Sequence, residues 1–377
     1  MRRILLIVSP QFTGLQYHRQ IMPHQYLIDT FSDFLVEQAI LNPDGLHELT
    51  DEKIQQYEAI SFLRHISLKG ETKNIIDRIH SLGVKVFFDI DDYWHLPSTH
   101  AMFLQYKHFK IPQQTEDALR HSDLVTTTTP FIRNYINKIN PNVFVLPNCI
   151  DERQEQFKPR KIDNGRVRFG GIWGVFHYED VKMIANNFTL LDNDKELKGK
   201  WQICLGGYTK GEDEYKKIES VMTNDNRMVK FDKDYSDYLK QETQSMEHVT
   251  FDKPYRRLYG RDVNTYGELY NEIDVALIPL VDDRFNNCKS QLKIIEAGIM
   301  GKAIIVSEIP PYILDNRADV IYVKDNRAGW YNAMKALIKN PEIIKQLGES
   351  LKSYVRENYS IDKITEQRCQ IYKHYLS

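Results

Sequence analysis

Short apolar runs alternate along this chain with longer stretches that have helical spacing. Uninterrupted apolar runs of this kind are typical of parallel strands that are buried on both faces, and the intervening helices cover those faces. The first half therefore predicts an α/β sheet. We expect its strands at Ile4 to Val8, 58–64, Val84 to Phe88, Leu124 to Thr127 and Val143 to Leu146, with helices at about 71–82 and 114–121.

The alternation stops at residues 147–165, a polar stretch with two prolines and a terminal glycine, and then restarts. A polar, proline-containing stretch between two patterned regions is typical of a linker between domains. From Gly329 the pattern is helical to the end, and Pro341 opens a second helix. The second set of strands is expected at 167–174, 201–207, 248–251, 273–280, 303–306 and 319–323.

The predicted architecture is thus two Rossmann-like lobes that face each other across a cleft, with a C-terminal helical tail. A chain of 377 residues is long enough for two separate cores. We expect an N-terminal Rossmann-like domain at 1–158 and a second Rossmann-like domain at 159–350. The last helix, 351–377, is expected to pack back on the N-terminal domain.

Charge, cysteine content and the short N-terminal apolar run argue against several classes of protein. Lys and Arg number 50 against 52 Asp and Glu, and a net charge of −2 gives no global attraction to nucleic acid. The four cysteines are far apart and form no C-x-x-C pair, which argues against disulfides and a zinc site and favours a reducing cytoplasm. The N-terminal apolar run of five residues is too short for a signal or membrane segment. We therefore expect a cytoplasmic protein without a metal site.

The stretch "NNCKSQLKIIEAGIMGKAIIVSE", residues 286–308, carries the clearest candidate chemistry. On a helix that begins near Ser290, that residue, Lys293 and Glu296 share a face. Lys289, Lys293 and the helix N-terminus could hold a diphosphate, and Glu296 could accept hydrogen bonds from two ribose hydroxyls. The alternative is an exposed ion pair between Lys293 and Glu296 that carries no ligand.

Two other strand ends carry candidate residues, since ligands of open parallel sheets bind at the carboxyl ends of the strands. Gly171 lies in "GGIWG", where a glycine-rich turn would let a phosphate approach the backbone; a plain tight turn is the alternative. The strand that ends in "DIDDYWHLP" carries Asp89, Asp91 and Asp92, which must meet water, a cation or a hydroxylated ligand. A turn and capping cluster is the other reading.

Arginine 19 follows the first strand in the loop "PQFTGLQYHRQIMP". Arg19 could neutralise a diphosphate, although an exposed arginine is the commoner outcome. Residues 102–110 and 253–261 mix basic and aromatic side chains, which could bind a glycan acceptor, an anionic membrane surface or a partner. Solvated surface is the simpler interpretation of both.

The segment "KSQLKIIEAGIMGKAIIVSEIPPY" resembles the donor-binding signature of the GT-B glycosyltransferases, in particular the large retaining family 4 (glycosyl transferases group 1). The matching residues are Ser290, Lys293, Glu296, Gly301 and Ser307. "VFVLPNCID" and "IDVALIPL" are similar to two further family segments. The resemblance implies transfer of a sugar from a UDP- or GDP-linked donor to a hydroxyl acceptor, with retention and without a metal. It also implies that the domain at 1–158 is the acceptor side and that the domain at 159–350 binds the nucleotide sugar. The donor would be a co-substrate, and no cofactor is expected.

The departures from the family pattern are as informative. Cys288 stands where the family has its first glutamate, so Asn286 or Asn287 is expected to contact the donor sugar instead. The family's Arg and Lys after the first strand of the second lobe are missing. Asp91 stands where many members carry a catalytic-site His, and Asp92 matches the Asp that follows it. The resemblance thus implies that Asp91 contacts the acceptor hydroxyl and the transferred sugar, with Asp92 as the second catalytic candidate.

Three functional alternatives remain open. The first is a metal-independent enzyme of polysaccharide or glycoconjugate assembly, acting on a glycan or a lipid-linked glycan, with peripheral contact at the inner membrane face. The second uses Asp89 and Asp91 as a D-x-D motif that holds Mn²⁺ or Mg²⁺. The third is a non-catalytic module that binds a nucleotide sugar or a glycan.

Overall fold

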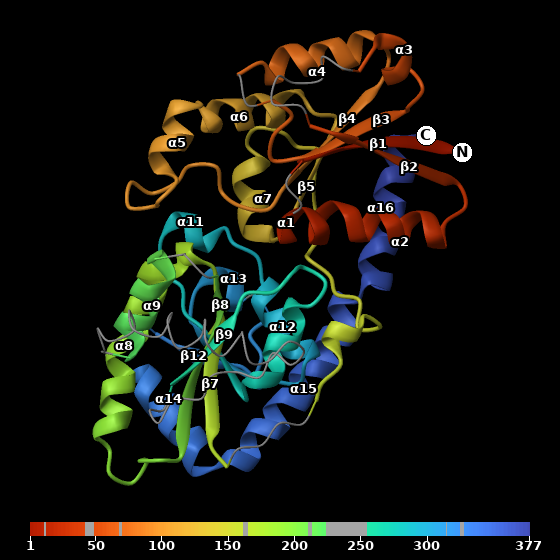
Figure 1. Cartoon of the computed structure of the whole chain (residues 1–377). Coiled ribbons are helices and arrows are strands. Elements are labelled where there is room, and N and C mark those ends of the chain that lie inside the picture. The colour runs from red at the N-terminus through yellow and green to blue at the C-terminus, as the bar shows by residue number, and fades with distance from the viewer. Residues whose placement is uncertain are drawn as a thin grey trace, which may run out of the picture. The chain divides into compact units, whose positions relative to one another are not determined.

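The computed structural model describes residues 1–10, 13–41, 49–67, 70–160, 165–209, 213–223, 255–313, 315–324 and 328–377. The predicted strand at 248–251 lies outside these residues. The chain forms two compact units, and each is made of segments that are distant in the sequence (Figure 1). The first unit is Met1–Asp151, Asp283–Leu292 and Asn358–Ser377, and the second is Glu152–Asp282 and Lys293–Glu357.

The first unit is built on a six-stranded parallel sheet with the order β2-β1-β3-β4-β5-β6. The sequence pattern predicts all of these strands except β2. Their bounds are β1 Arg2–Val8, β2 Phe34–Ile40, β3 Ala59–Leu63, β4 Lys85–Ile90, β5 Leu124–Thr127 and β6 Val143–Val145. The helices are α1 Gly14–Gln16, a π-helical turn Tyr17–Ile21, α2 Met22–Thr30, α3 Asp51–Ile54, α4 Thr72–Ser81, α5 Phe103–His108, α6 Ile111–His121, α7 Pro130–Ile136, α11 Arg284–Asn287 and α16 Ile361–Tyr375.

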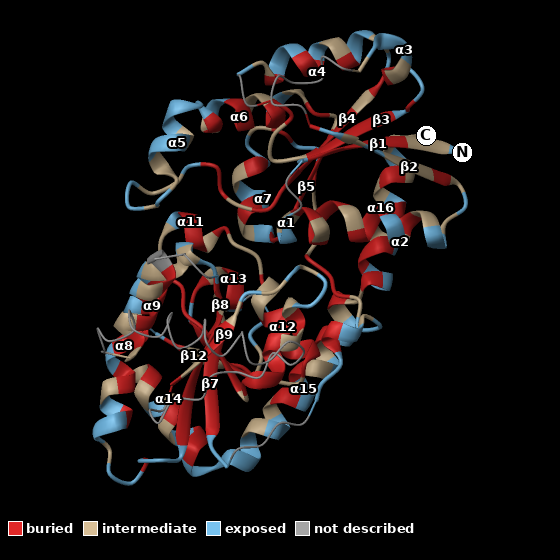
Figure 2. Ribbon diagram, in the orientation of Figure 1, coloured by how far each residue is buried: buried red, intermediate tan, exposed pale blue. Residues whose placement is uncertain are grey.

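Alternating side chains of each strand serve opposite faces of this sheet, as strand geometry requires. In β1, Leu5 and Ile7 pack in a core with residues of α4, α6 and α7. Ile4 and Leu6 pack in a second core, to which α16 contributes Tyr372. The sheet is therefore buried on both sides, which explains why its strands are apolar throughout (Figure 2).

The second unit repeats the architecture with the strand order β12-β11-β10-β7-β8-β9, again all parallel. Its strands are β7 Val167–Ile172, β8 Trp201–Tyr208, β9 Tyr255–Tyr259, β10 Val275–Ile278, β11 Ala303–Ser307 and β12 Ile321–Val323. Its helices are α8 Tyr178–Asn193, α9 Asp213–Thr223, α12 Leu292–Ile299, α13 Pro310–Ile313, α14 Gly329–Lys339 and α15 Pro341–Tyr359, with 3₁₀ turns at Glu155–Phe157, Val175–His177 and Tyr266–Glu272. Helices α12 and α15 each cross a boundary between the units. Two parallel α/β sheets with a helical C-terminal end confirm the predicted fold class.

In each sheet, the direction in which successive strands are added reverses beside the first strand. The chain places β2 on one side of β1 and β3 on the other, and likewise β8 and β10 on the two sides of β7. Ligands of open α/β sheets bind outside the carboxyl ends of the strands at such a switch point. A ligand site is therefore expected among the residues that follow β3, β4, β7 and β10.

Candidate functional site

The carboxyl edge of the first sheet holds a cluster of one arginine and two aspartates. Arg64 directly follows β3, and Asp91 and Asp92 directly follow the neighbouring strand β4. The Arg64 guanidinium donates to both oxygens of Asp91, from Nε to Oδ1 at 2.7 Å and from Nη2 to Oδ2 at 2.8 Å. Its Nη2 also donates to Oδ2 of Asp92 at 2.5 Å. One cation thus holds two adjacent carboxylates at the end of the sheet.

The backbone of Arg64 is in the left-handed region, with φ of 59°. A residue with a side chain reaches this region at a cost, and such conformations persist where the surrounding structure enforces them. Here the Arg64 N–H donates to the carbonyl oxygen of Asp89 at 3.0 Å while its side chain turns to the two aspartates. The strain and the ion pairs together fix where the two carboxylates stand.

Asp91 and Asp92 differ in how they are held. Asp91 is buried and gives both oxygens to Arg64, whereas Asp92 is half-buried and gives it only Oδ2. Within the described residues, no hydrogen bond to Oδ1 of Asp92 is present. Burial raises the pKa of the Asp92 carboxyl, its neighbour Asp91 raises it further, and Arg64 and Lys289 oppose the change. Asp92 is therefore the member of the pair with an oxygen available to a ligand.

Asp89 is not part of this cluster, because its side chain pairs inside the unit with Arg19. Arg19 donates to Asp89 from Nε at 2.9 Å and from Nη2 at 2.6 Å, and Thr126 adds a third hydrogen bond at 2.5 Å. Arg19 is 1% exposed and also donates to the carbonyl oxygen of Leu146. The expectation of an exposed arginine is thus wrong, and the supposed loop is helical from Gly14. Contact of Arg19 with a diphosphate stays a prediction.

The segment Asp283–Leu292 belongs to the first unit and places the candidates Asn287, Lys289 and Ser290 there. Asp283 caps the short helix α11, which contains Asn287. The ammonium of Lys289 lies over the Phe285 ring at 5.1 Å from its centroid, and its charge acts on Asp92. The predicted helix begins two residues later than Ser290, whose Oγ accepts a hydrogen bond from Asn148 Nδ2 at 2.8 Å.

Cys288, which stands where the resemblance implies a glutamate, is fully buried among residues of the first core. Burial raises the pKa of its thiol to about 12. A neutral buried thiol offers no charge and little hydrogen bonding to a sugar. The position is therefore part of the packing, and any polar contact to a sugar must come from a different residue.

Glu296 lies in the second unit on α12, at 5% exposure. Its Oε1 accepts a hydrogen bond from the Tyr266 phenol at 2.6 Å, and its Oε2 accepts one from Tyr270 at 2.8 Å. Burial raises the pKa of the carboxyl, while Lys293 and the two phenols oppose this. The alternative of an exposed Lys293–Glu296 surface pair is wrong, because Glu296 is buried and Lys293 is half-buried.

The glycine-rich segment 170–174 is not the turn that we expected. Gly170 and Gly171 lie within the strand, and packing explains both of them. A Cβ on Gly170 would stand 2.0 Å from the carbonyl oxygen of Cys204 on β8, and one on Gly171 would stand 2.0 Å from the Trp173 indole. Close approach of neighbouring groups, rather than of a phosphate, requires these glycines. The donor role of Gly171 stays a prediction.

The switch point of the second sheet is tied together by Asp180 of α8. Its Oδ2 pairs with His177 Nδ1 at 2.8 Å, and its Oδ1 accepts the Val281 N–H at 2.9 Å. Val281 lies in the loop after β10, so one buried carboxylate connects the ends of β7 and β10. This arrangement orders the loop where a ligand of an α/β sheet is expected.

Residues 253–261 are also different from the expectation of solvated surface, in the part that the structure describes. Residues 255–259 form β9, and Arg257 is 1% exposed in a two-oxygen ion pair with Glu219, with both distances 2.6 Å. Arg256 pairs with Glu272 at 2.7 Å. By contrast, the helix α5 within 102–110 buries none of its residues, and Leu104 is 76% exposed.

The sequence reasoning missed Arg64, Asn148, Tyr266 and Tyr270. Arg64 could have been found, because it stands at the carboxyl end of a predicted strand next to the strand that carries the aspartates. The two tyrosines gave no comparable signal. Searches of the described residues find no helix long and apolar enough to cross a membrane and no group of three or more side chains suited to a metal ion.

Comparison with known proteins identifies the fold and leaves the family open. No family model and no curated protein sequence matches this chain. Among solved structures it is similar to a sucrose-phosphate synthase from Thermosynechococcus elongatus (12% identity, TM-score 0.65, 99% of each chain covered). It is also similar to the Anabaena protein HepE in complex with UDP (10%, 0.67, 99% of this chain and 100% of that one). A UDP-forming α,α-trehalose-phosphate synthase from Burkholderia xenovorans matches over the whole of both chains (13%, 0.61). The chain has the GT-B fold of these proteins.

Proposed function

We propose that this protein is a glycosyltransferase that moves a sugar from a UDP- or GDP-linked donor to a hydroxyl acceptor. The observation that carries the proposal is the Arg64 cluster, in which Asp92 keeps one carboxylate oxygen available at the end of the sheet in a GT-B fold. The UDP complex of HepE and the UDP-forming trehalose-phosphate synthase support the choice of donor. Fold alone does not transfer a substrate, so the chemistry must be argued from this chain's residues.

The acceptor side of the reaction is assigned to Asp91 and Asp92. Oδ1 of Asp92 would accept a hydrogen bond from the acceptor hydroxyl and so orient it toward the anomeric carbon. The carboxylate charge would also stabilise the positive charge that develops on the sugar in the transition state. Asp91, held by both its oxygens, would act by keeping Arg64 and hence Asp92 in place. This division refines the sequence-based assignment, in which Asp91 contacts the acceptor.

The donor side is assigned to residues around α12. The charges of Lys289 and Lys293 would stabilise the departing diphosphate, with Ser290, Asn287 and Gly171 as further donor contacts. Glu296 would bind the ribose hydroxyls. Since both of its oxygens already accept phenol hydrogen bonds, we propose that the ribose displaces the half-buried Tyr266 and leaves Tyr270 in place.

Independence of a metal is also part of the proposal. A D-x-D metal site would need Asp89 and Asp91 to turn their carboxylates to one cation. Asp89 is held by Arg19 and Thr126, and Asp91 is held by Arg64 through both oxygens. Breaking two guanidinium pairs to form such a site would be costly. Membership of family 4, retention of configuration, action in the cytoplasm on glycan or lipid-linked acceptors and a place in polysaccharide or glycoconjugate assembly complete the proposal.

The test is a panel of UDP- and GDP-sugars assayed for released nucleoside diphosphate with and without EDTA, together with thermal shifts by UDP and GDP. We expect one nucleotide to raise the melting temperature and release of that diphosphate to survive EDTA. Release that EDTA abolishes would return the function to the D-x-D alternative. Stabilisation with no release, even when glycan acceptors are supplied, would favour the non-catalytic module. The anomeric signal of the product in NMR would then decide between retention and inversion.

A further inference from the structure

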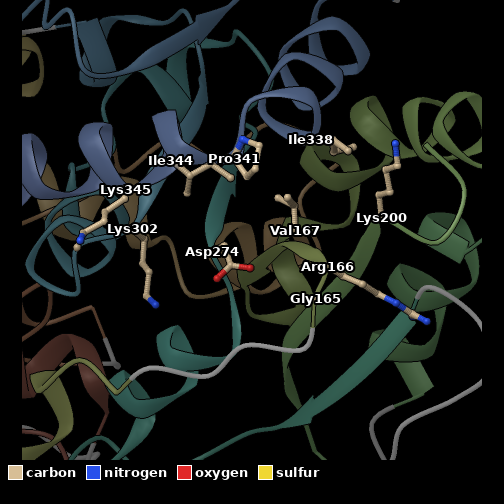
Figure 3. Close-up of a pocket in the computed structure, with 11 residues that line it drawn as sticks. Gly165, Arg166, Val167, Lys200, Asp274, Lys302, Ile338, Pro341, Ile344 and Lys345 are labelled. Carbon is tan, nitrogen blue, oxygen red and sulfur yellow. The ribbon is translucent and has the colours of Figure 1, made fainter. Parts of the chain in front are cut away.

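A cavity of about 510 Å³ opens in the second unit at the edge of the sheet that the proposed reaction does not use (Figure 3). Val167 begins β7, and Lys200, Asp274 and Lys302 directly precede β8, β10 and β11. All four strands are parallel, so the cavity lies at their amino ends. The carboxyl edge is one strand length away, on the order of 15 Å. This cavity is thus separate from the candidate donor residues.

The lining is strongly basic. Arg166, Lys200, Lys302 and Lys345 contribute four positive charges, and Asp274 is the acidic member. Asp274 is already neutralised, because Arg168 donates to its two oxygens at 3.0 and 2.6 Å. Among the described residues, neither an ion pair nor a hydrogen bond of a lysine ammonium of this lining is present. The cavity therefore has an excess of positive charge that a bound anion would balance.

Lys302 is the most significant of these cations, because it is half-buried where it follows Gly301 at the end of α12. Burial lowers the pKa of its ammonium to about 8; Arg168 and Lys352 act in the same direction, and Asp274 and Glu272 oppose it. A partly desolvated ammonium without an anion in contact is destabilised. A ligand that brought a phosphate oxygen to Nζ would restore the favourable charge.

The opposite wall is apolar and consists of Ile338, Pro341 and Ile344, where α14 meets α15. We propose that this cavity is a second ligand site that binds a phosphate ester, with the phosphate on Lys302 and the organic part against α14 and α15. The phosphate belongs either to a small metabolite or to an anionic lipid headgroup. Neither source depends on the glycosyltransferase proposal.

The test uses pyrophosphate as the soluble probe, titrated into the full chain by calorimetry, and vesicles of phosphatidylcholine with and without phosphatidylglycerol. Lys302→Met should weaken pyrophosphate binding roughly tenfold or more, since a charged hydrogen bond is lost. Lys198→Met, an exposed lysine two residues from Lys200, is the matched control and should not weaken it. Lys293→Met removes a candidate donor residue, so the pyrophosphate binding that remains in this variant reports on the cavity, and adding Lys302→Met to it should weaken that binding. Because the Lys302 charge is desolvated, its removal should not unfold the protein.

Each result has a defined meaning. Vesicle binding that requires phosphatidylglycerol and Lys302, without pyrophosphate binding, would identify a lipid headgroup as the source of the phosphate. Equal affinity of Lys302→Met and the native chain, or loss of binding in Lys293→Met alone, would overturn the proposal, as would the absence of binding to both probes. A second readout is pH: sulfate, whose charge is constant near neutrality, should bind less tightly as the pH rises past about 8, and Lys302→Met should abolish that dependence.

Discussion

The candidate carboxylates of the first unit and Glu296 of the second have different hydrogen-bond partners. In the first unit, Asp89 and Asp91 each receive a guanidinium through both oxygens. In the second unit, Glu296 receives only neutral phenols, from Tyr266 and Tyr270. A bidentate guanidinium fixes both charge and geometry, whereas a phenol can be exchanged for a ligand hydroxyl at little cost. The first unit therefore holds its carboxylates rigidly, which suits the positioning of a reacting group. The second unit holds Glu296 by partners that a ligand can replace.

The contrast also appears in the ionisation of the two sites. Asp92 and Glu296 both have a pKa that burial raises. For Asp92, Arg64 and Lys289 oppose the shift with full positive charges, but for Glu296 the opposition comes from Lys293 and two neutral hydroxyls.

Removal of a deeply buried cation, Arg19, should have the largest effect. Arg19→Met leaves Asp89 charged and buried, and breaking such a pair costs about 3–5 kcal/mol of unfolding free energy, measured by urea denaturation. Arg2→Met is the control, because Arg2 and Asp33 form a more exposed pair, with side chains 28% and 38% exposed, worth about 1 kcal/mol or less. If Arg19→Met kept its stability but lost nucleotide binding, Arg19 would serve the donor as its sequence context suggested.

The Arg64 cluster is tested through Asp92. Asp92→Asn keeps the shape but removes the charge, and we expect kcat to fall by roughly 10²–10⁴ with nucleotide-induced thermal shifts unchanged. Asp77→Asn, an exposed aspartate on α4, is the control. Asp92 must be ionised to act, so kcat/KM should fall as the pH drops through a pKa above the ordinary 3.8. Full activity of Asp92→Asn would remove the residue from the mechanism.

Arg64→Lys sharpens the same test with a smaller change. Lysine keeps the charge but cannot bond to both oxygens of Asp91 while it also holds Asp92. We expect kcat to fall by roughly tenfold or more with little change in KM, because only the positioning of Asp92 is lost. An equal change in KM would mean that Arg64 itself contacts a substrate.

The sequence could predict features that depend on neighbouring residues in the chain. It could not predict contacts between residues that are distant in the sequence. Apolar runs are local, so the strands predicted from them within the described residues were correct. Arg64 meets Asp91 only because β3 and β4 are neighbours in the sheet. The basic residues of β9 were expected on the surface because Glu219 and Glu272, their buried partners, come from other elements. The glycines of β7 were misinterpreted for the same reason, since Cys204 of β8 is the group that excludes a side chain at Gly170.

Substitution of Glu296 in the second unit should have a smaller effect. Glu296→Gln should weaken binding of the stabilising nucleotide by about tenfold, since a charged hydrogen bond becomes neutral. The exposed Glu342→Gln is the control.

The raised pKa of Glu296 means that the folded state holds the proton of this carboxyl more tightly than the unfolded chain does. Its contribution to stability is therefore complete below the ordinary value of 4.5 and is lost as the pH rises through the higher folded pKa. The native chain should lose stability relative to Glu296→Gln over that interval.

Tyr266→Phe should have the smallest effect, because it removes one neutral hydrogen bond worth about 0.5–1.5 kcal/mol. If a ribose replaces this phenol on Glu296, the variant has one partner fewer to displace, and the nucleotide should bind equally well or more tightly. Tyr270→Phe removes the phenol that the ligand leaves in place, so it should not tighten binding. Calorimetry of both variants with the stabilising nucleotide distinguishes them. Weaker binding in Tyr266→Phe would mean that this phenol contacts the ligand itself. The partners of Glu296 would then be as fixed as the guanidinium partners of Asp89 and Asp91.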